Sequence, residues 1–158
     1  MEINILIEEE IETEPDAGWM QKVIEKVLTQ ENLPNEVEIS LLITDQEKIR
    51  ELNRQYRGKD RPTDVLSFAM SEQREEAEPT SFIGPPDGLL HLGEVIISYP
   101  QAVMQAQERR HSIKREMAIL IVHGVLHVLG YDHERAEMEP AMAAKEKGIL
   151  AELEKEIE

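Results

Sequence analysis

The 158-residue sequence contains no cysteine. This absence excludes a disulfide scaffold, a thiol nucleophile and a thiolate metal site, and it predicts that no partner is held by a disulfide. A chain without thiols suits a reducing compartment, so we expect a cytoplasmic protein. No apolar run approaches the roughly 20 residues that a membrane helix needs, and residues 1–10 lack a basic leader before an apolar stretch. We therefore expect neither secretion nor membrane insertion.

Aromatic and basic residues are also scarce. Aromatic residues make up 4% of the chain, and 17 Lys and Arg stand against 33 Asp and Glu, which gives a formal net charge of −16. The scarcity of aromatic rings predicts weak base stacking, and the net charge alone disfavours a polyanionic partner. The bases are concentrated, however. Residues 47–61 carry six of them against three acids, which predicts a locally basic strip on an acidic body: Lys48, Arg50, Arg54, Arg57, Lys59 and Arg61.

Hydrophobic periodicity predicts one α/β domain over residues 1–158, with a sheet covered by helices. Alternating or β-branched segments predict strands at 3–9, 36–44, within 62–70, and at 89–98. Helical spacing predicts helices at 16–31, capped by Asp16, and at 45–56, capped by Asp45. Further helices are expected at 100–111, at 113–130 and over 134–157, the last interrupted or kinked near Pro140. Residues 71–88, acidic and rich in proline, are expected to form an exposed loop.

The sequence IVHGVLHVLGYDH (121–133) holds three of the five histidines of the chain. His123 and His127 are four residues apart, so on a helix both rings project from one face. Gly130 can take a left-handed conformation and end the helix, which would let His133 return toward the other two. Three imidazoles without a fourth protein ligand form an open metal site.

A single histidine on an apolar helix is usually a packed core residue. Three at this spacing, with a glycine at the helix end, instead indicate a metal site at the end of the central apolar helix. Imidazole ligands suit zinc best, so we predict one zinc ion per chain, with nickel or copper as possible substitutes in vitro.

The spacing H-x-x-x-H-x-x-G-x-x-H is also that of the metzincin metalloproteases. Those enzymes carry a glutamate after the first histidine as the general base, whereas this chain carries Gly124. The substitution argues against peptide hydrolysis. A metzincin-like hydrolase of another substrate remains an alternative.

Three ordered blocks resemble the YbeY family of endoribonucleases: HGVLHVLGYDH, LNRQYRGKDRPTDVLSF (52–68) and LGEVIIS (92–98). The resemblance implies a single-strand-specific, metal-dependent endoribonuclease with a mixed sheet of about four strands. It implies a role in ribosomal RNA processing, notably at the 3′ end of the small-subunit RNA, and in ribosome quality control. The implied partners are single-stranded ribosomal RNA and the ribosome or its small-subunit proteins. The family's zinc ligands match His123, His127 and His133, and its active-site arginine matches Arg57.

Alone, Arg57 would be interpreted as a solvated arginine at a helix end; the resemblance assigns it to catalysis and phosphate binding. Lys59 and Arg61 follow in the same basic loop and either hold the RNA backbone or are ordinary surface charges. The chain departs from the family at Ala69, where proline is usual, and at Glu94, where aspartate is common. A ribosome-associated factor with a structural zinc is the remaining alternative, although an open three-histidine site disfavours it.

Overall fold

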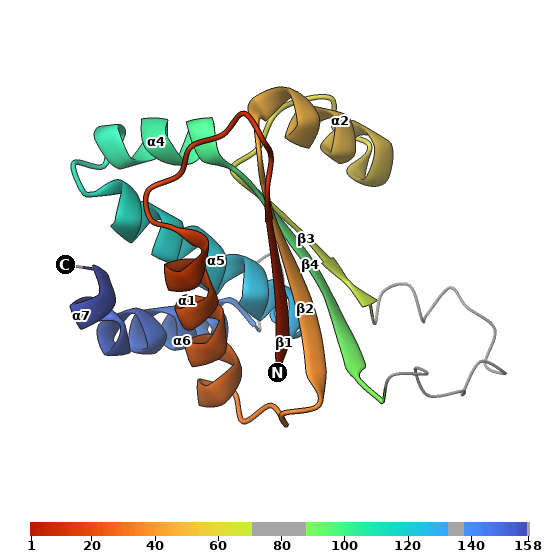
Figure 1. Cartoon of the computed structure of the whole chain (residues 1–158), viewed down its shortest axis with the longest axis vertical. Coiled ribbons are helices and arrows are strands. Elements are labelled where there is room, and N and C mark those ends of the chain that lie inside the picture. Colours follow the sequence, from red (N-terminus) through yellow and green to blue (C-terminus); the bar gives the residue numbers. More distant parts are fainter. Residues whose placement is uncertain (71–87, 133–137, 158) are drawn as a thin grey trace, which may run out of the picture.

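The computed structural model describes residues 1–70, 88–132 and 138–157. Its centre is a four-stranded sheet in the order β1–β2–β4–β3 (Figure 1). Strands β1, β2 and β4 run parallel, whereas β3 is antiparallel to β4 and forms one edge. The mixed sheet expected from the sequence is confirmed. Its strands are β1 (Glu2–Ile7), β2 (Val37–Thr44), β3 (Val65–Ala69) and β4 (Leu90–Ser98).

The helices begin and end close to the predicted positions. Asp16 and Asp45 cap two of them, each accepting a backbone N–H of the first turn through its side chain. No kink is present at Pro140, because Pro140 lies in the first turn of a helix that begins at Glu139, where its missing N–H removes no helical bond. The predicted interruption concerns residues 134–137, which lie outside the described part of the chain. Residues 71–87 of the expected loop lie outside the described part of the chain. The helices are α1 (Ala17–Gln30), α2 (Gln46–Arg57), α4 (Tyr99–Glu108), α5 (Ile113–Val128), α6 (Glu139–Glu152) and α7 (Glu154–Ile157).

The two faces of the sheet are covered unequally (Figure 1). Helices α1, α5 and α6 lie on one face, where the main core includes Ile24, Ile39 and Ile121. The other face is covered at one end by α2, whose Ile49 packs on Leu66 and Ile96 in a second, smaller cluster. We call this second surface the α2 face of the sheet. In the described residues no helix is long and apolar enough to cross a membrane.

A buried carboxylate ties α4 to α5. The side chain of Glu116, in the first turn of α5, is fully buried and accepts hydrogen bonds from Arg109 (2.9 Å) and Gln105 (2.8 Å). His111 lies 2.6 Å from the same carboxylate. This arrangement satisfies the charge that burial would otherwise make costly, and it gives His111 a structural role.

Candidate functional site

Helix α5 brings two of the predicted metal ligands together. His123 and His127 lie one turn apart, and their ring centroids are 4.6 Å apart in an edge-to-face arrangement. Both lie in the second half of a helix that is otherwise almost entirely buried in the core. The packing of α5 against the sheet therefore fixes the backbone from which both imidazoles project.

A carboxylate from another helix holds the first of these rings. Oε1 of Glu146, on α6, lies 2.6 Å from Nδ1 of His123, and both side chains are 26% exposed. Metal-binding histidines are commonly oriented by a carboxylate on the ring nitrogen that does not bind the metal. Sequence reasoning missed Glu146, because its position gives no signal until α6 packs against α5.

The end of α5 turns the chain as predicted. Gly130 has a φ of +110°, its N–H donates to the carbonyl of His127 (3.0 Å), and that of Tyr131 donates to the carbonyl of Leu126 (3.1 Å). These two bonds form a Schellman motif, which ends α5 at Val128 with Leu129 as the C-cap. His133, the third predicted ligand, lies outside the described residues. The turn at Gly130, which the prediction requires in order to direct the chain toward His123 and His127, is present.

Tyr131 anchors this turn to two other helices. Its hydroxyl is hydrogen-bonded to Glu31, which raises the pKa of Tyr131 above its usual value, with burial adding to the effect. Glu31 also forms an ion pair with Lys145 at 3.1 Å. Lys145 precedes Glu146 on α6, so one carboxylate at the end of α1 holds both the turn after α5 and the helix that supports His123.

Gly124, between the two histidines, touches the sheet. A Cβ at this position would lie 2.5 Å from Cγ1 of Val95 and 3.2 Å from Cγ2 of Val65. The carbonyl of Gly124 accepts a hydrogen bond from the hydroxyl of Ser67 at 3.0 Å. The metzincin glutamate is therefore sterically excluded here, because no side chain fits between α5 and the sheet.

Ser67 also connects the histidines to the predicted arginine. Its carbonyl accepts a hydrogen bond from Nη2 of Arg57 at 2.6 Å. Along an antiparallel strand, the backbone groups of successive residues point alternately toward the partner strand and away from it. The carbonyl of Asp64 accepts from Ser98 N and so points toward β4. Ser67, three residues later, therefore points its carbonyl away from β4, to the open edge of the sheet. Arg57 thus lies at the β3 edge, and a single residue links it to α5.

The Arg57 side chain is further fixed by an aromatic ring. Its guanidinium lies over Phe68 at 5.0 Å from the ring centroid, and Tyr56 meets Phe68 edge-to-face at 5.5 Å. Arg57 is the last residue of α2, which ends at Gly58 with a φ of +71°. The position combines a favourable interaction with the helix dipole and a cation–π contact.

Lys59 and Arg61 lie in the loop after α2, and both are exposed. The buried amide of Asn53 donates to the carbonyl of Arg61 at 2.9 Å, and Arg50 pairs with Asp60 at 2.9 Å. These bonds fold the loop back against α2. The loop therefore presents two basic side chains beside the helix end that carries Arg57.

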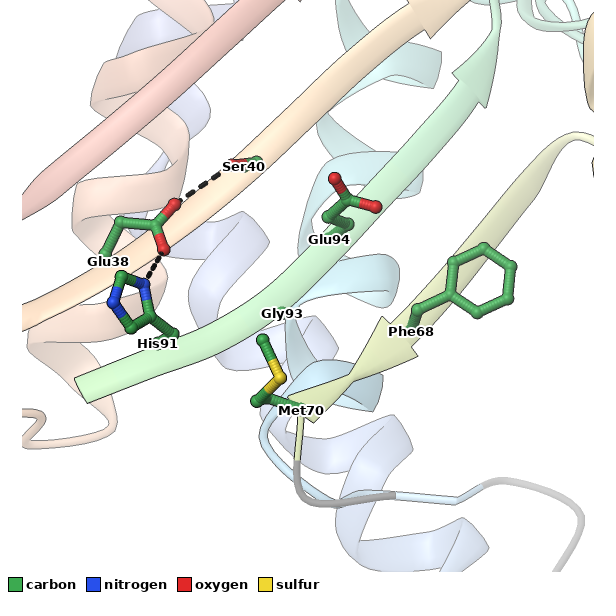
Figure 2. A pocket seen from close by; sticks show the side chains of 7 residues that line it. All are labelled: Glu38, Ser40, Phe68, Met70, His91, Gly93 and Glu94. Carbon is green, nitrogen blue, oxygen red and sulfur yellow. Dashed lines mark hydrogen bonds and ion pairs between the residues drawn. The ribbon is translucent and has the colours of Figure 1, made fainter. Parts of the chain in front are cut away.

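A pocket of about 300 Å³ lies on the α2 face, beside β3 (Figure 2). Figure 2 shows Glu38 pointing toward His91, with Glu94 projecting from the same face. Burial raises the pKa of Glu38, but hydrogen bonds from His91, Ser40 and Asn4 outweigh it and hold the pKa below its usual value. The lining residues are Glu38, Ser40, Phe68, Met70, His91, Gly93 and Glu94.

Two backbone features create this pocket. The register of β4 against β2 shifts between Glu38 and Ile39, which places His91 opposite Glu38. Gly93 has a φ of +146°, and a Cβ there would lie 2.1 Å from the carbonyl oxygen of Phe68. Sequence reasoning assigned no catalytic role to His91, and the structure gives it a partner in Glu38 instead.

The chain is similar to known proteins in both sequence and fold. The family model described as Endoribonuclease YbeY matches residues 2–154. An Endoribonuclease YbeY of Dehalococcoides mccartyi is 46% identical over 144 residues, covering 90% of this chain and 87% of the relative. One from Geobacillus thermodenitrificans is 46% identical over 150 residues, covering 94% and 90%. A solution structure of a Thermotoga maritima protein superposes with a TM-score of 0.58 at 26% identity, covering 98% of this chain and 88% of the other.

Proposed function

The chain belongs to the YbeY endoribonuclease family and is an RNA-cleaving hydrolase. We propose that it cuts single-stranded ribosomal RNA at a site formed by the end of α5, by Glu146 of α6 and by Arg57 at the β3 edge. The observation that carries this proposal is the double contact of Ser67, which joins Arg57 to the backbone between His123 and His127.

The proposed metal ligands are His123, His127 and His133, and the proposed ion is zinc. Within the described residues no group of three potential ligands is assembled, and His133 lies outside them. The described part of the site fits an imidazole-bound ion, because two rings are adjacent and one of them is held through Nδ1 by a carboxylate. A zinc ion bound there would supply a Lewis acid and lower the pKa of a bound water to about 7.

Arg57 is proposed to bind the phosphate at the point of cleavage. A guanidinium carries a permanent charge and a planar fork of donors that matches two phosphate oxygens. The Ser67 carbonyl and the Phe68 ring fix the plane of this fork before RNA arrives. Preorganised charge of this kind stabilises the negative charge that develops on the phosphoryl oxygens during cleavage.

Lys59 and Arg61 are proposed to hold the RNA backbone next to Arg57. Both extend from the same loop, and contacts with phosphates position a strand without reading its sequence. We place this activity in the cytoplasm, with the 3′ end of small-subunit ribosomal RNA as the target and the ribosome or its small-subunit proteins as partners. The same cleavage would serve ribosome quality control, because a nuclease that reads the backbone can attack exposed single strands in defective particles.

The alternatives are less well supported. A peptide hydrolase of the metzincin type needs a glutamate where the sheet leaves room only for Gly124. A factor with a purely structural zinc would require four protein ligands in the usual case, whereas the sequence offers three histidines. It would also leave the preorganised Arg57 without a role.

The proposal is tested with end-labelled single-stranded RNA and protein of known metal content. We expect wild-type protein to cleave, and both Arg57→Ala and His127→Ala to lose cleavage. Arg57→Ala should retain its zinc, whereas His127→Ala should lose it. Cleavage that survives in both variants would indicate a contaminating nuclease, and the chain would then be interpreted as a binding factor.

A further inference from the structure

We propose that the pocket on the α2 face binds one nucleobase of the RNA strand whose phosphate sits at Arg57, and that it favours cytosine over uracil. This inference rests on the proposed function and adds a base-binding subsite to it. The subsite consists of the Phe68 ring, with Tyr56 and Arg57 against it, and of the carboxylate of Glu94.

The first argument is the concentration of aromatic rings. The chain has one Trp, three Tyr and two Phe, and two of these six rings meet at the end of α2. Tyr56 is 60% exposed. A packing role alone gives no reason to keep a tyrosine exposed against a phenylalanine and an arginine. Sites for single-stranded RNA combine aromatic rings with arginine in this way.

The second argument is the adjacency of the pocket to this aromatic pair. Phe68 lines the pocket, and its ring stands on the same face of the sheet as Glu94 (Figure 2). The volume of about 300 Å³ lies at the lower end of the range for ligand pockets, as a single base would require. Gly93 also lines the pocket, and it has to be glycine because a Cβ there would lie 2.1 Å from the carbonyl oxygen of Phe68.

The third argument is the chemistry of the lining. Glu38 already accepts hydrogen bonds from Asn4 and Ser40 and pairs with His91. Glu94 is exposed and has no hydrogen bond or ion pair among the described residues. An ionised carboxylate can only accept, so it would bind the 4-amino group of cytosine. At the same position uracil presents its 4-oxo group, which the carboxylate repels, and only its N3–H is left as a donor.

The charges also orient the strand. The acids on the α2 face repel phosphates, whereas Arg57, Lys59 and Arg61 attract them to the β3 edge and the adjacent loop. An RNA strand that follows the edge would thus keep its backbone near Arg57 and turn a base over Phe68. Duplex RNA cannot splay a base in this way, which is consistent with an enzyme for single strands.

The test measures binding of 5′-labelled oligocytidylate and oligouridylate by fluorescence anisotropy, together with an oligomer of abasic nucleotides. We expect wild-type protein to bind oligocytidylate about five- to tenfold more tightly than oligouridylate. Phe68→Leu keeps the apolar bulk that packs on the second cluster, and Tyr56→Ala removes an exposed ring. Each should weaken oligocytidylate binding about tenfold. Tyr56→Ala should leave abasic binding unchanged. Phe68→Leu also removes the ring beneath Arg57, so it should weaken abasic binding as well, but by a smaller factor.

Glu94→Gln tests the base preference itself. An amide donates as well as accepts, so the ratio of the affinities for oligocytidylate and oligouridylate should fall to about one. Met104→Ala, an exposed apolar residue on α4, is the control and should change nothing. Three results would overturn the proposal: equal wild-type binding of both oligomers, an undiminished preference in Glu94→Gln, or a loss of abasic binding in Tyr56→Ala as large as its loss of oligocytidylate binding. Cleavage of the same RNA is scored separately. If wild type cleaves but shows no base preference, only the subsite fails; if it does not cleave, the proposed function fails.

Discussion

Gly124 of α5 lies directly against Val95 of β4, so closely that a Cβ on the glycine would be 2.5 Å from Cγ1 of the valine. Val95 is 1% exposed and belongs to the main core, so it cannot move aside at little cost. The close approach sets the distance between the two histidines and the sheet that carries Ser67.

Gly124→Ala should lower the free energy of unfolding by about 1–3 kcal/mol, because the added methyl overpacks the contact between helix and sheet. Gly148→Ala is the matched control, since that glycine lies within α6 with no atom within 4 Å of the added Cβ. It should raise the free energy of unfolding by about 0.5–1 kcal/mol. Urea denaturation measures both. A Gly124→Ala variant as stable as wild type would mean that the contact is not tight.

Glu146→Ala should weaken metal binding about 10- to 100-fold, because the His123 ring loses the carboxylate that orients it. Affinity is measured by competition with a chromophoric chelator, without reference to activity. Glu152→Ala removes a more exposed carboxylate of the same helix, which pairs with Lys26, and should leave metal affinity unchanged. Equal affinities for the two variants would show that Glu146 does not orient His123.

Arg57→Lys should reduce kcat/KM for RNA cleavage about 100-fold or more although the charge is retained, because lysine lacks the planar fork. Metal content should not change. Arg54→Lys, an exposed arginine about one turn earlier on α2, is the control and should lose little activity. If the two substitutions have the same effect, Arg57 acts only as a general positive charge.

Glu38→Gln should alter the stability of the protein as a function of pH. The folded pKa of Glu38 lies below its usual value of 4.5, so the ionised carboxylate stabilises the fold above that pH, and this contribution is lost as the pH falls through the folded pKa. We expect the variant to be about 1–2 kcal/mol less stable at neutral pH and to approach wild type in acid.

Urea denaturation at a series of pH values measures this difference. Glu36→Gln changes an exposed carboxylate just before β2 and should follow the wild-type profile. If the free energy of unfolding differs between Glu38→Gln and wild type by the same amount at every pH, the ionised Glu38 carboxylate is not the source of the stabilisation.

RNA affinity should fall as salt rises, with a modest slope because the basic region is small. Replacing both Lys59 and Arg61 by alanine should make the slope of log K against log salt shallower by about 1.4, because each phosphate that is no longer neutralised reduces the slope by about 0.7. Lys155→Ala on α7, across the core from α2 (Figure 1), should not change the slope. An unchanged slope in the double variant would make these residues ordinary surface charges.

The sequence by itself determined the features that arise from neighbouring residues. The caps Asp16 and Asp45, the left-handed Gly130 and the strand alternation follow from local backbone preferences, and the structure confirms them. The spacing of His123 and His127 sufficed to place both rings together, because one helical turn separates them. Pro140 shows the limit of such reasoning. A proline disrupts the interior of a helix but fits its first turn, and the sequence did not show that a helix begins at Glu139.

The metal-binding roles of His123, His127 and His133 and the RNA-binding roles of Arg57, Lys59 and Arg61 remain predictions. Only the tertiary structure decided how the described side chains of the site are supported. The Glu146–His123 contact spans 23 positions in the sequence, and the Ser67–Gly124 bond spans 57. Both depend on how α6 packs on α5 and on which edge of the sheet β3 occupies. A sequence pattern shows which face of an element is apolar but not which element will cover it, so these contacts are set by packing across the whole domain.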